Sequence, residues 1–249
     1  MNEFTGWSII GDGELASVLR RAAEYIPIAT RVTVIVDTKQ GPEGAFALGS
    51  AMLQSPSERV VPLESAFEAV EAVRASVAAG ECGRVYGCFT SIRVRRGSSS
   101  SDVRDAALLP AIAMTLDTVP GPLARVWARQ ASLFAPDDAW FVTIRLRDET
   151  LLTIEVMASE PDAGAREILV ELTSSERVLR AEPTRQAVVV EPLGQAAMSR
   201  PWWEDLGERY LRLVLQRAER PHDGAGTRLR TAWEAILTSA SSGEPVEFT

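Results

Sequence analysis

The chain has 249 residues, 46% hydrophobic and 24% charged, which is enough to bury one large core or two smaller ones. Its formal net charge of -8 argues against a nucleic-acid or anionic-membrane partner, since neither would be attracted to an acidic surface. No uninterrupted apolar run reaches the ~18 residues that a membrane span needs, and the first residues lack the basic start of a signal peptide, so a cytoplasmic protein is expected.

The residue types that carry most side-chain chemistry are scarce in this sequence. Cys82 and Cys88 lie six residues apart, a spacing that matches no common zinc or redox motif, so two free thiols and no bound metal are predicted. Lys39 is the only lysine, which makes it the only candidate for a Schiff base. His222 is the only histidine, and its polar loop setting predicts an exposed residue instead of a catalyst.

The N-terminal residues predict the beginning of a dinucleotide-binding fold. An apolar strand at 7–10 leads into a glycine turn at 11–16, a helix follows at 17–23, and a second strand spans 32–36. Asp37 ends that strand about twenty residues beyond the turn, which is where dinucleotide sites keep an acidic residue for the ribose. The order of strand, glycine turn, helix, strand and acid therefore predicts a nucleotide site.

Four residues would form this predicted cofactor site. Gly11 permits the tight turn, Gly13 lets a pyrophosphate approach the backbone, and Ala16 lets helix and strand pack closely. Asp37 would bind the ribose of NAD and repel the 2′-phosphate of NADP. The alternative is a strand-helix-strand turn that keeps its glycines for packing only.

The rest of the first domain is shorter than a complete nucleotide-binding domain. Residues 41–53 are predicted as a helical stretch, 59–63 as a third short strand and 65–79 as an amphipathic helix. A complete doubly wound domain has about six strands. We therefore predict a truncated Rossmann-like domain over residues 1–78, in which any NAD binding is weak and involves mainly the adenosine half.

The second predicted domain, residues 79–249, is organised around a broad sheet between residues 124 and 194. Apolar and polar residues alternate from 139 to 157, and a turn at 147–150 joins two strands as a hairpin. One face of these strands is expected to be buried, with the inward residues Trp140, Val142, Ile144, Leu146, Leu152, Ile154 and Val156. That face requires cover by helices or by another subunit.

Further elements are predicted before and after this sheet. A strand spans 84–95, and a helix spans 102–116 with Pro110 as an interior residue that should kink it. Two amphipathic helices follow the sheet at 202–218 and 227–240. The predicted fold class is α/β (α+β), with a truncated Rossmann-like N-terminal half followed by an open, mostly antiparallel sheet covered by helices.

Four segments of the second domain form a pattern: 79–85, Trp203-Glu204-Asp205-Leu206, Ala232-Trp233-Glu234-Ala235-Ile236 and Gly243-Glu244-Pro245-Val246. This pattern resembles the Gfo/Idh/MocA oxidoreductase family, which includes glucose-fructose oxidoreductase and inositol dehydrogenases. The resemblance implies an N-terminal Rossmann domain that binds NAD or NADP. It also implies a C-terminal α/β domain whose open sheet often forms the subunit interface.

The sequence departs from that family at its catalytic motifs. The family's E-K-P motif, whose lysine contacts substrate and nicotinamide, should lie between residues 63 and 75, where no lysine occurs. The family's D-x-x-x-H-x-x-D helix aligns with residues 110–117, where Pro110 and Met114 replace the acid and the histidine. Only Asp117 remains, and we interpret it as a structural residue at a helix end.

Two functions remain open on the sequence, and neither has assigned catalytic residues. In the first, the chain is a family homologue that lacks the catalytic lysine and histidine and acts as a degenerate binding or partner subunit, for example of a full-length paralogue. In the second, it is an active enzyme on a small hydroxylated or polycyclic metabolite. That enzyme is either NAD(P)-dependent or repurposed for isomerisation, elimination or cyclisation.

A homodimer or higher homo-oligomer is expected through the outer face of the sheet. On that face Phe141, Leu151, Met157 and Leu169 are interspersed with polar and charged residues. Such a mixture is typical of a protein interface. The alternative is a monomer whose scattered surface hydrophobic residues have no function.

Overall fold

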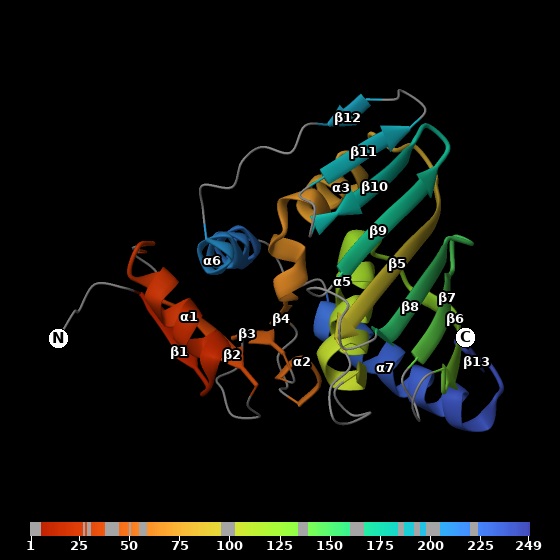
Figure 1. Cartoon of the computed structure of the whole chain (residues 1–249), viewed down its shortest axis with the longest axis horizontal. Coiled ribbons are helices and arrows are strands. Elements are labelled where there is room, and N and C mark those ends of the chain that lie inside the picture. The colour runs from red at the N-terminus through yellow and green to blue at the C-terminus, as the bar shows by residue number, and fades with distance from the viewer. Residues whose placement is uncertain are drawn as a thin grey trace. The chain divides into compact units, whose positions relative to one another are not determined.

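The computed structural model describes residues 6–26, 28, 31–37, 45–49, 51–54, 59–95, 103–133, 139–159, 167–183, 187–191, 195–197, 205–219 and 224–249. The predictions for Lys39 and His222 fall outside these residues. Contacts divide the chain into two compact units (Figure 1). Unit 1 consists of Met1–Phe67 and Pro201–Arg230, and unit 2 of Glu68–Arg200 and Thr231–Thr249. The domain boundary expected after residue 78 stays a prediction.

Unit 1 contains a parallel sheet of four strands in the order β1-β2-β3-β4. Its elements are β1 (Trp7–Ile10), α1 (Glu14–Ala23), β2 (Val32–Val36), β3 (Phe46–Leu48), α2 (Ala51–Gln54), β4 (Arg59–Val60), the 3-10 helix η1 (Leu63–Ala66) and α6 (Leu206–Ala218). In a complete doubly wound sheet the first strand is central and the strand order reverses there. In the described part of this unit each successive strand is added on the same side, so β1 is an edge strand among the described strands.

The segment from residue 41 to 53 was predicted as helical, and this is wrong for its described central part. Phe46–Leu48 is a strand, and only Ala51–Gln54 is helical among the described residues of the segment. All three residues of β3 are buried, and the strand pairs with β2 on one side and β4 on the other. A short apolar run without alternation does not distinguish a buried parallel strand from a helix.

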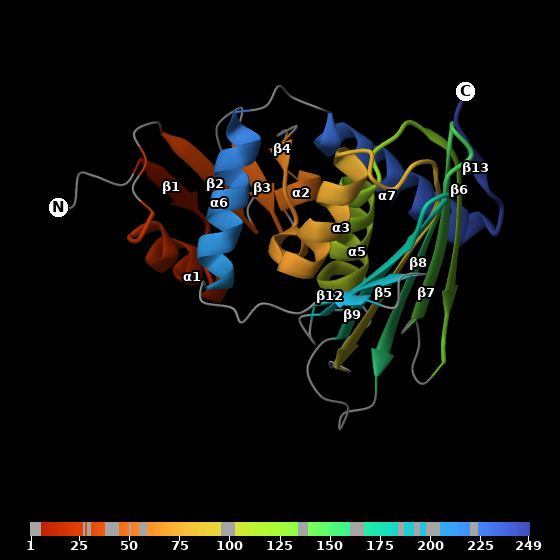
Figure 2. The same cartoon turned by 90° about the horizontal axis from the view of Figure 1, so that it is seen from above.

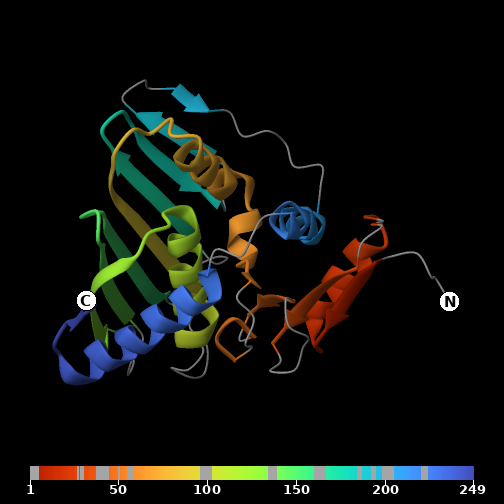
Figure 3. The same ribbon diagram turned by 180° about the vertical axis from the view of Figure 1, so that it is seen from behind.

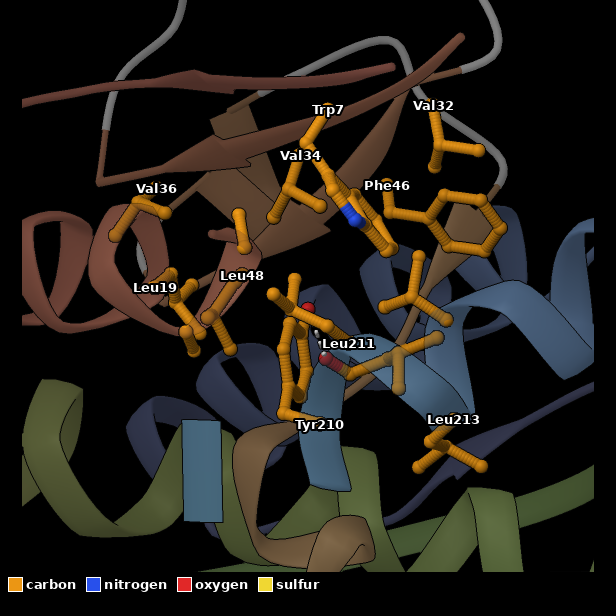
Figure 4. Close-up of a cluster of buried hydrophobic side chains, with 14 of the residues drawn as sticks. Trp7, Leu19, Val32, Val34, Val36, Phe46, Leu48, Tyr210, Leu211 and Leu213 are labelled. Atoms are coloured by element: carbon orange, nitrogen blue, oxygen red, sulfur yellow. Dashed lines mark hydrogen bonds between the residues drawn. The ribbon is translucent and has the colours of Figure 1, made fainter. Parts of the chain in front are cut away.

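The core of unit 1 joins two segments that are far apart in the sequence. Figure 4 shows Tyr210 and Leu211 of α6 in one buried cluster with Trp7, Val34 and other side chains of the sheet. The Tyr210 hydroxyl donates a hydrogen bond to the Val61 carbonyl at 3.2 Å. The helix predicted as amphipathic over 202–218 therefore buries one face, which includes Tyr210, Leu213 and Val214.

Unit 2 contains a nine-stranded sheet in the order β12-β11-β10-β9-β5-β8-β7-β6-β13. Its strands are β5 (Val85–Arg95), β6 (Leu123–Ala131), β7 (Ala139–Leu146), β8 (Leu151–Ser159), β9 (Glu167–Ser174), β10 (Val178–Glu182), β11 (Ala187–Glu191), β12 (Gln195–Ala197) and β13 (Val246–Glu247). Only the pair β5 and β8 is parallel. The predicted fold class, a parallel nucleotide-type sheet followed by an open and mostly antiparallel sheet, is confirmed.

Helices cover one face of this sheet. They are α3 (Glu68–Ala78), α5 (Leu109–Thr118) and α7 (Ala225–Ser242), which begins within unit 1 (Figures 2 and 3). All seven residues predicted to point inward on β7 and β8 are at most 3% exposed. On the opposite face Leu151 is 45% exposed and Trp127 is 37% exposed. The alternation predicted for the hairpin is therefore confirmed.

The helix around Pro110 contains a π-helical turn that the sequence did not predict. This turn, η2 (Arg104–Leu108), runs directly into α5, so the helix predicted over 102–116 is observed from residue 103 and Pro110 lies in its interior, two residues after the π turn. Proline has no backbone N–H to donate, and a change of hydrogen-bond register at a π turn accommodates that loss.

No helix in the described ranges is long and apolar enough to cross a membrane.

Candidate functional site

The glycine turn between β1 and α1 has the backbone geometry that the sequence predicted. Gly11 has φ 134° and Gly13 has φ 98°, both values that L side chains rarely adopt. A Cβ atom at Gly11 would lie 2.1 Å from the Val36 carbonyl oxygen, so close packing against β2 requires this glycine. At Gly13 no heavy atom lies within 4 Å of the position that a Cβ atom would take, which leaves room for a ligand. Ala16 is fully buried in the core.

Asp37 follows β2 at the same edge of the sheet. Its backbone has φ 49°, and its N–H donates to the Leu48 carbonyl at 3.2 Å. Its carboxylate lies against Gly49, where an added Cβ atom would come within 2.1 Å of Oδ1. The side chain is nevertheless exposed. Since the carboxyl ends of parallel strands share one edge, Gly11, Gly13 and Asp37 lie at that edge, and their role in cofactor binding stays a prediction.

The charges around this turn do not favour a phosphate. Asp12 and Glu14 are both exposed, and Glu14 occupies the first turn of α1, where a dinucleotide site places its pyrophosphate. Carboxylates repel that group and already compensate the positive end of the helix. Arg20 is a nearby cation that the sequence reading missed. It donates to the carbonyl of Ile9 at 3.4 Å and to that of Gly11.

Helix α5 offers no acid or base at the two positions where the family resemblance places them. Met114 is fully buried, and Pro110 lies two residues after the π turn. The polar side chains along the buried part of α5 are threonines. The Thr115 hydroxyl hydrogen-bonds to the Ala111 carbonyl at 2.6 Å and to the Thr90 hydroxyl at 2.8 Å. The contact with Thr90 joins α5 to β5, and the two threonines supply no group that titrates near neutral pH.

Asp117 is engaged in an ion pair inside unit 2. Its Oδ2 lies 4.0 Å from Nε of Arg74 on α3, and the side chains are 9% and 11% exposed. Arg74 also lies 3.9 Å from Glu71. Arg74 is the only basic residue between residues 63 and 75, the segment where the family resemblance implies a catalytic lysine. Its guanidinium contacts α5 through Asp117. This contact supports the structural interpretation of Asp117.

The two cysteines are free, as predicted, and both are buried. Burial raises the pKa of Cys88 to about 12 and also raises the pKa of Cys82. Both are therefore neutral thiols near pH 7 and poor nucleophiles. Burial likewise raises the pKa of Tyr210. Among the described residues, no group of His, Cys, Asp and Glu side chains could hold a metal ion.

A hollow of about 200 Å³ lies on the outer face of the sheet of unit 2. Ser91 and Arg93 of β5, Glu167 of β9, and Arg180 and Glu182 of β10 are among its lining residues. Arg180 and Glu182 form an ion pair at 2.9 Å. The two arginines and two glutamates balance in charge, so the hollow has no net preference for an anion or a cation.

Comparisons with known proteins identify the fold. No protein-family model and no curated sequence match this chain. Levoglucosan dehydrogenase in complex with NADH has a similar structure at 12% identity, with 98% of each chain covered and a TM-score of 0.71. A myo-inositol dehydrogenase from Corynebacterium glutamicum matches at 16% identity, 98% of each chain and a TM-score of 0.68. UDP-N-acetylglucosamine 3-dehydrogenase GnnA from Acidithiobacillus ferrooxidans matches at 11% identity, with 95% of this chain, 97% of that chain and a TM-score of 0.70.

These likenesses establish the architecture of the chain. It has the two-domain fold of the Gfo/Idh/MocA-type dehydrogenases, and the predicted resemblance is confirmed at the level of the fold. Identities between 11% and 16% carry the fold and not the activity. Any catalytic or binding activity of the chain therefore depends on the side chains that it presents itself.

Proposed function

We propose that this chain is an oxidoreductase-fold protein that does not carry out conventional hydride transfer and acts as a binding or partner subunit. The observation that carries the proposal is the chemistry of α5. Where the family resemblance calls for an acid and a histidine, this helix presents Pro110 and a fully buried Met114. Loss of a positioned acid or base typically costs about 10²- to 10⁴-fold in rate.

The other charged residues near these positions support the same proposal. Asp117 is paired with Arg74, and the segment that should contain the catalytic lysine has no lysine. Both cysteines are neutral thiols because burial raises their pKa. In the described part of the chain, neither α5 nor the Asp117–Arg74 ion pair therefore offers a free acid or base that could take the proton of a substrate hydroxyl group.

The residues around the glycine turn fit only part of NAD, the cofactor that such a fold implies. Gly13 has open space at its Cα, and Asp37 is exposed at the same sheet edge, so the adenosine half of NAD could bind there. The pyrophosphate would meet Asp12 and Glu14, and the strands that normally lie beyond β1 are missing from the described sheet. We therefore propose that NAD binding is weak, involves mainly the adenosine half and is preferred over NADP.

Calorimetry with NAD, NADP and ADP tests this assignment. NAD and ADP should bind with affinities within about threefold of each other, since the nicotinamide half adds little contact. Asp37→Ala should weaken NAD binding, and Asp12→Asn should strengthen it because a repelling charge is removed. A native mass spectrum of purified protein adds the subunit count. Tight NADP binding, or NAD affinity indifferent to Asp37→Ala, would overturn the assignment.

We also propose that the subunit contact of the chain is the outer face of the sheet of unit 2. Charges on that face are unevenly distributed. Arg125, Arg129 and Arg145 lie on β6 and β7, and Arg125 pairs with Glu247 of β13 at 2.9 Å. The half of the sheet formed by β5 and β8 to β10 carries Glu155, Glu167, Glu171 and Glu182 against Arg93 and Arg180, so it keeps a net negative charge. A second copy packed in a two-fold arrangement would place the positive half of one sheet on the negative half of the other.

Light scattering coupled to size exclusion tests the sheet contact. Phe141→Glu and Leu169→Glu each place a carboxylate on the partly exposed outer face and should convert a dimer into monomers. Ala72→Glu, on the exposed surface of α3, is the matched control and should leave the mass unchanged. A monomeric wild type at micromolar concentration, or a dimer that tolerates both sheet substitutions, would show that this face is not the contact.

A further inference from the structure

The outer edge of β1 has an unusual position for a first strand. In doubly wound sheets another strand pairs with this edge, but no strand in the described part of unit 1 does so. An open edge presents unpaired N–H and C=O groups that can template pairing with another chain. Natural sheets therefore need a means of covering such an edge.

The register of β1 identifies which of its backbone groups face this edge. The Gly6 carbonyl accepts a hydrogen bond from the N–H of Val32 at 2.8 Å, so Gly6 faces β2. Backbone groups alternate in direction along a strand, and β1 pairs with β2 in unbroken register from Trp7 to Ile10. The N–H and C=O groups of Trp7 and Ile9 therefore point away from β2, toward the open edge.

Arg20 contacts the carbonyl groups on this edge. From the last turn of α1 its guanidinium donates to the Ile9 carbonyl at 3.4 Å and to the Gly11 carbonyl, which is the next outward carbonyl along the chain. A charged guanidinium satisfies two acceptors that a neighbouring strand would otherwise satisfy. It also places a positive charge where an added strand would approach, which is one of the ways in which natural sheets protect their edges.

We propose that Arg20 keeps the outer edge of β1 closed, and that without it two copies of this chain pair edge to edge through β1. A second copy is the fitting partner because the outward donors and acceptors of Trp7 and Ile9 are complementary to the same residues of a rotated copy. Such an isologous antiparallel contact obeys two-fold symmetry. The contact would involve unit 1 and is independent of whether the chain binds NAD.

The test compares Arg20→Ala with Arg21→Ala by sedimentation over a concentration series. Arg21 is the adjacent exposed arginine on the same helix and has the same charge, so it controls for the change in net charge. Arg20→Ala should lower the dissociation constant for self-association at least about tenfold relative to wild type. Arg21→Ala should behave like wild type.

A second substitution locates the contact on β1. The N–H of Ile9 points to the open edge, so Ile9→Pro removes an outward donor without removing a bond to β2. The double variant Arg20→Ala with Ile9→Pro should return to the wild-type mass. If Arg20→Ala does not fold, Arg20→Lys, whose ammonium retains the charge but lacks the planar fork, should show an intermediate increase. A folded Arg20 variant with wild-type mass at all concentrations, or an equal increase in Arg21→Ala, would overturn the proposal.

Discussion

The glycine turn of unit 1 and helix α5 of unit 2 are the two regions where the family resemblance implies cofactor and catalytic groups, and they differ in what they retain. The turn keeps its backbone geometry, with Gly11 and Gly13 in conformations that favour glycine. Helix α5 keeps its place against the sheet but presents Pro110 and Met114. Backbone features that also serve packing can persist without a ligand, whereas a catalytic side chain has no such second role.

The largest expected effect is on the free energy of unfolding, and it tests whether packing against β2 is the reason for a glycine at position 11. Gly11→Ala would bring a Cβ atom to 2.1 Å from the Val36 carbonyl oxygen and should cost about 3 kcal/mol or more of unfolding free energy. Gly13→Ala is the matched control, because its φ is also positive but the space around it is open. It should cost less, about 1 to 2 kcal/mol, because only backbone strain is added. Urea denaturation measures both, and equal costs would contradict the role of the Val36 contact.

The second effect concerns the buried thiol of β5. Burial raises the pKa of Cys88 from 9.0 to about 12, so above pH 9 the unfolded chain loses this proton while the folded chain keeps it. Stability from this group is fully present below pH 9 and falls as pH rises, by about 1.4 kcal/mol per pH unit between the two pKa values. Wild type should therefore show a steeper alkaline loss than Cys88→Ala. Identical slopes would place the thiol in contact with water.

A smaller effect distinguishes a structural Asp117 from a catalytic one. Asp117→Asn removes the charge that pairs with Arg74 and should cost about 1 to 2 kcal/mol in urea denaturation, since both side chains are largely buried. Glu71→Gln is the control on the same arginine. Its carboxylate is 34% exposed, and its loss should cost only a few tenths of a kcal/mol, on the order of an exposed helix pair. An Asp117→Asn variant of unchanged stability would contradict the structural role.

Much of the fold was predictable because strands with one buried face carry a clear period of two. The hairpin of β7 and β8 follows from that alternation, and Glu149 adopts φ 73° in the connecting turn. The inward face of α6 followed in the same way from helical spacing. Phe46–Leu48 was not predictable, because a strand buried on both faces shows no alternation.

The candidate site was predictable at positions where the backbone conformation requires a particular residue type. Gly11 and Gly13 belong to this class, and their positive φ values were implied by the turn. The edge contact of Arg20 was not, because it depends on β1 being the last strand of its sheet, which is a property of the strand order. The pairing of Asp117 with Arg74 likewise depends on how α3 and α5 pack in unit 2.

The most direct test of the account is the absorbance of NADH and NADPH during incubation of the purified chain with NAD or NADP and a panel of polyols and sugars. Because Pro110 and Met114 supply no acid or base and residues 63 to 75 contain no lysine, we expect no turnover above that of heat-denatured protein. Turnover of about 1 s⁻¹ or faster with any member of the panel, which is within the range of ordinary enzymes, would contradict the loss of conventional hydride transfer.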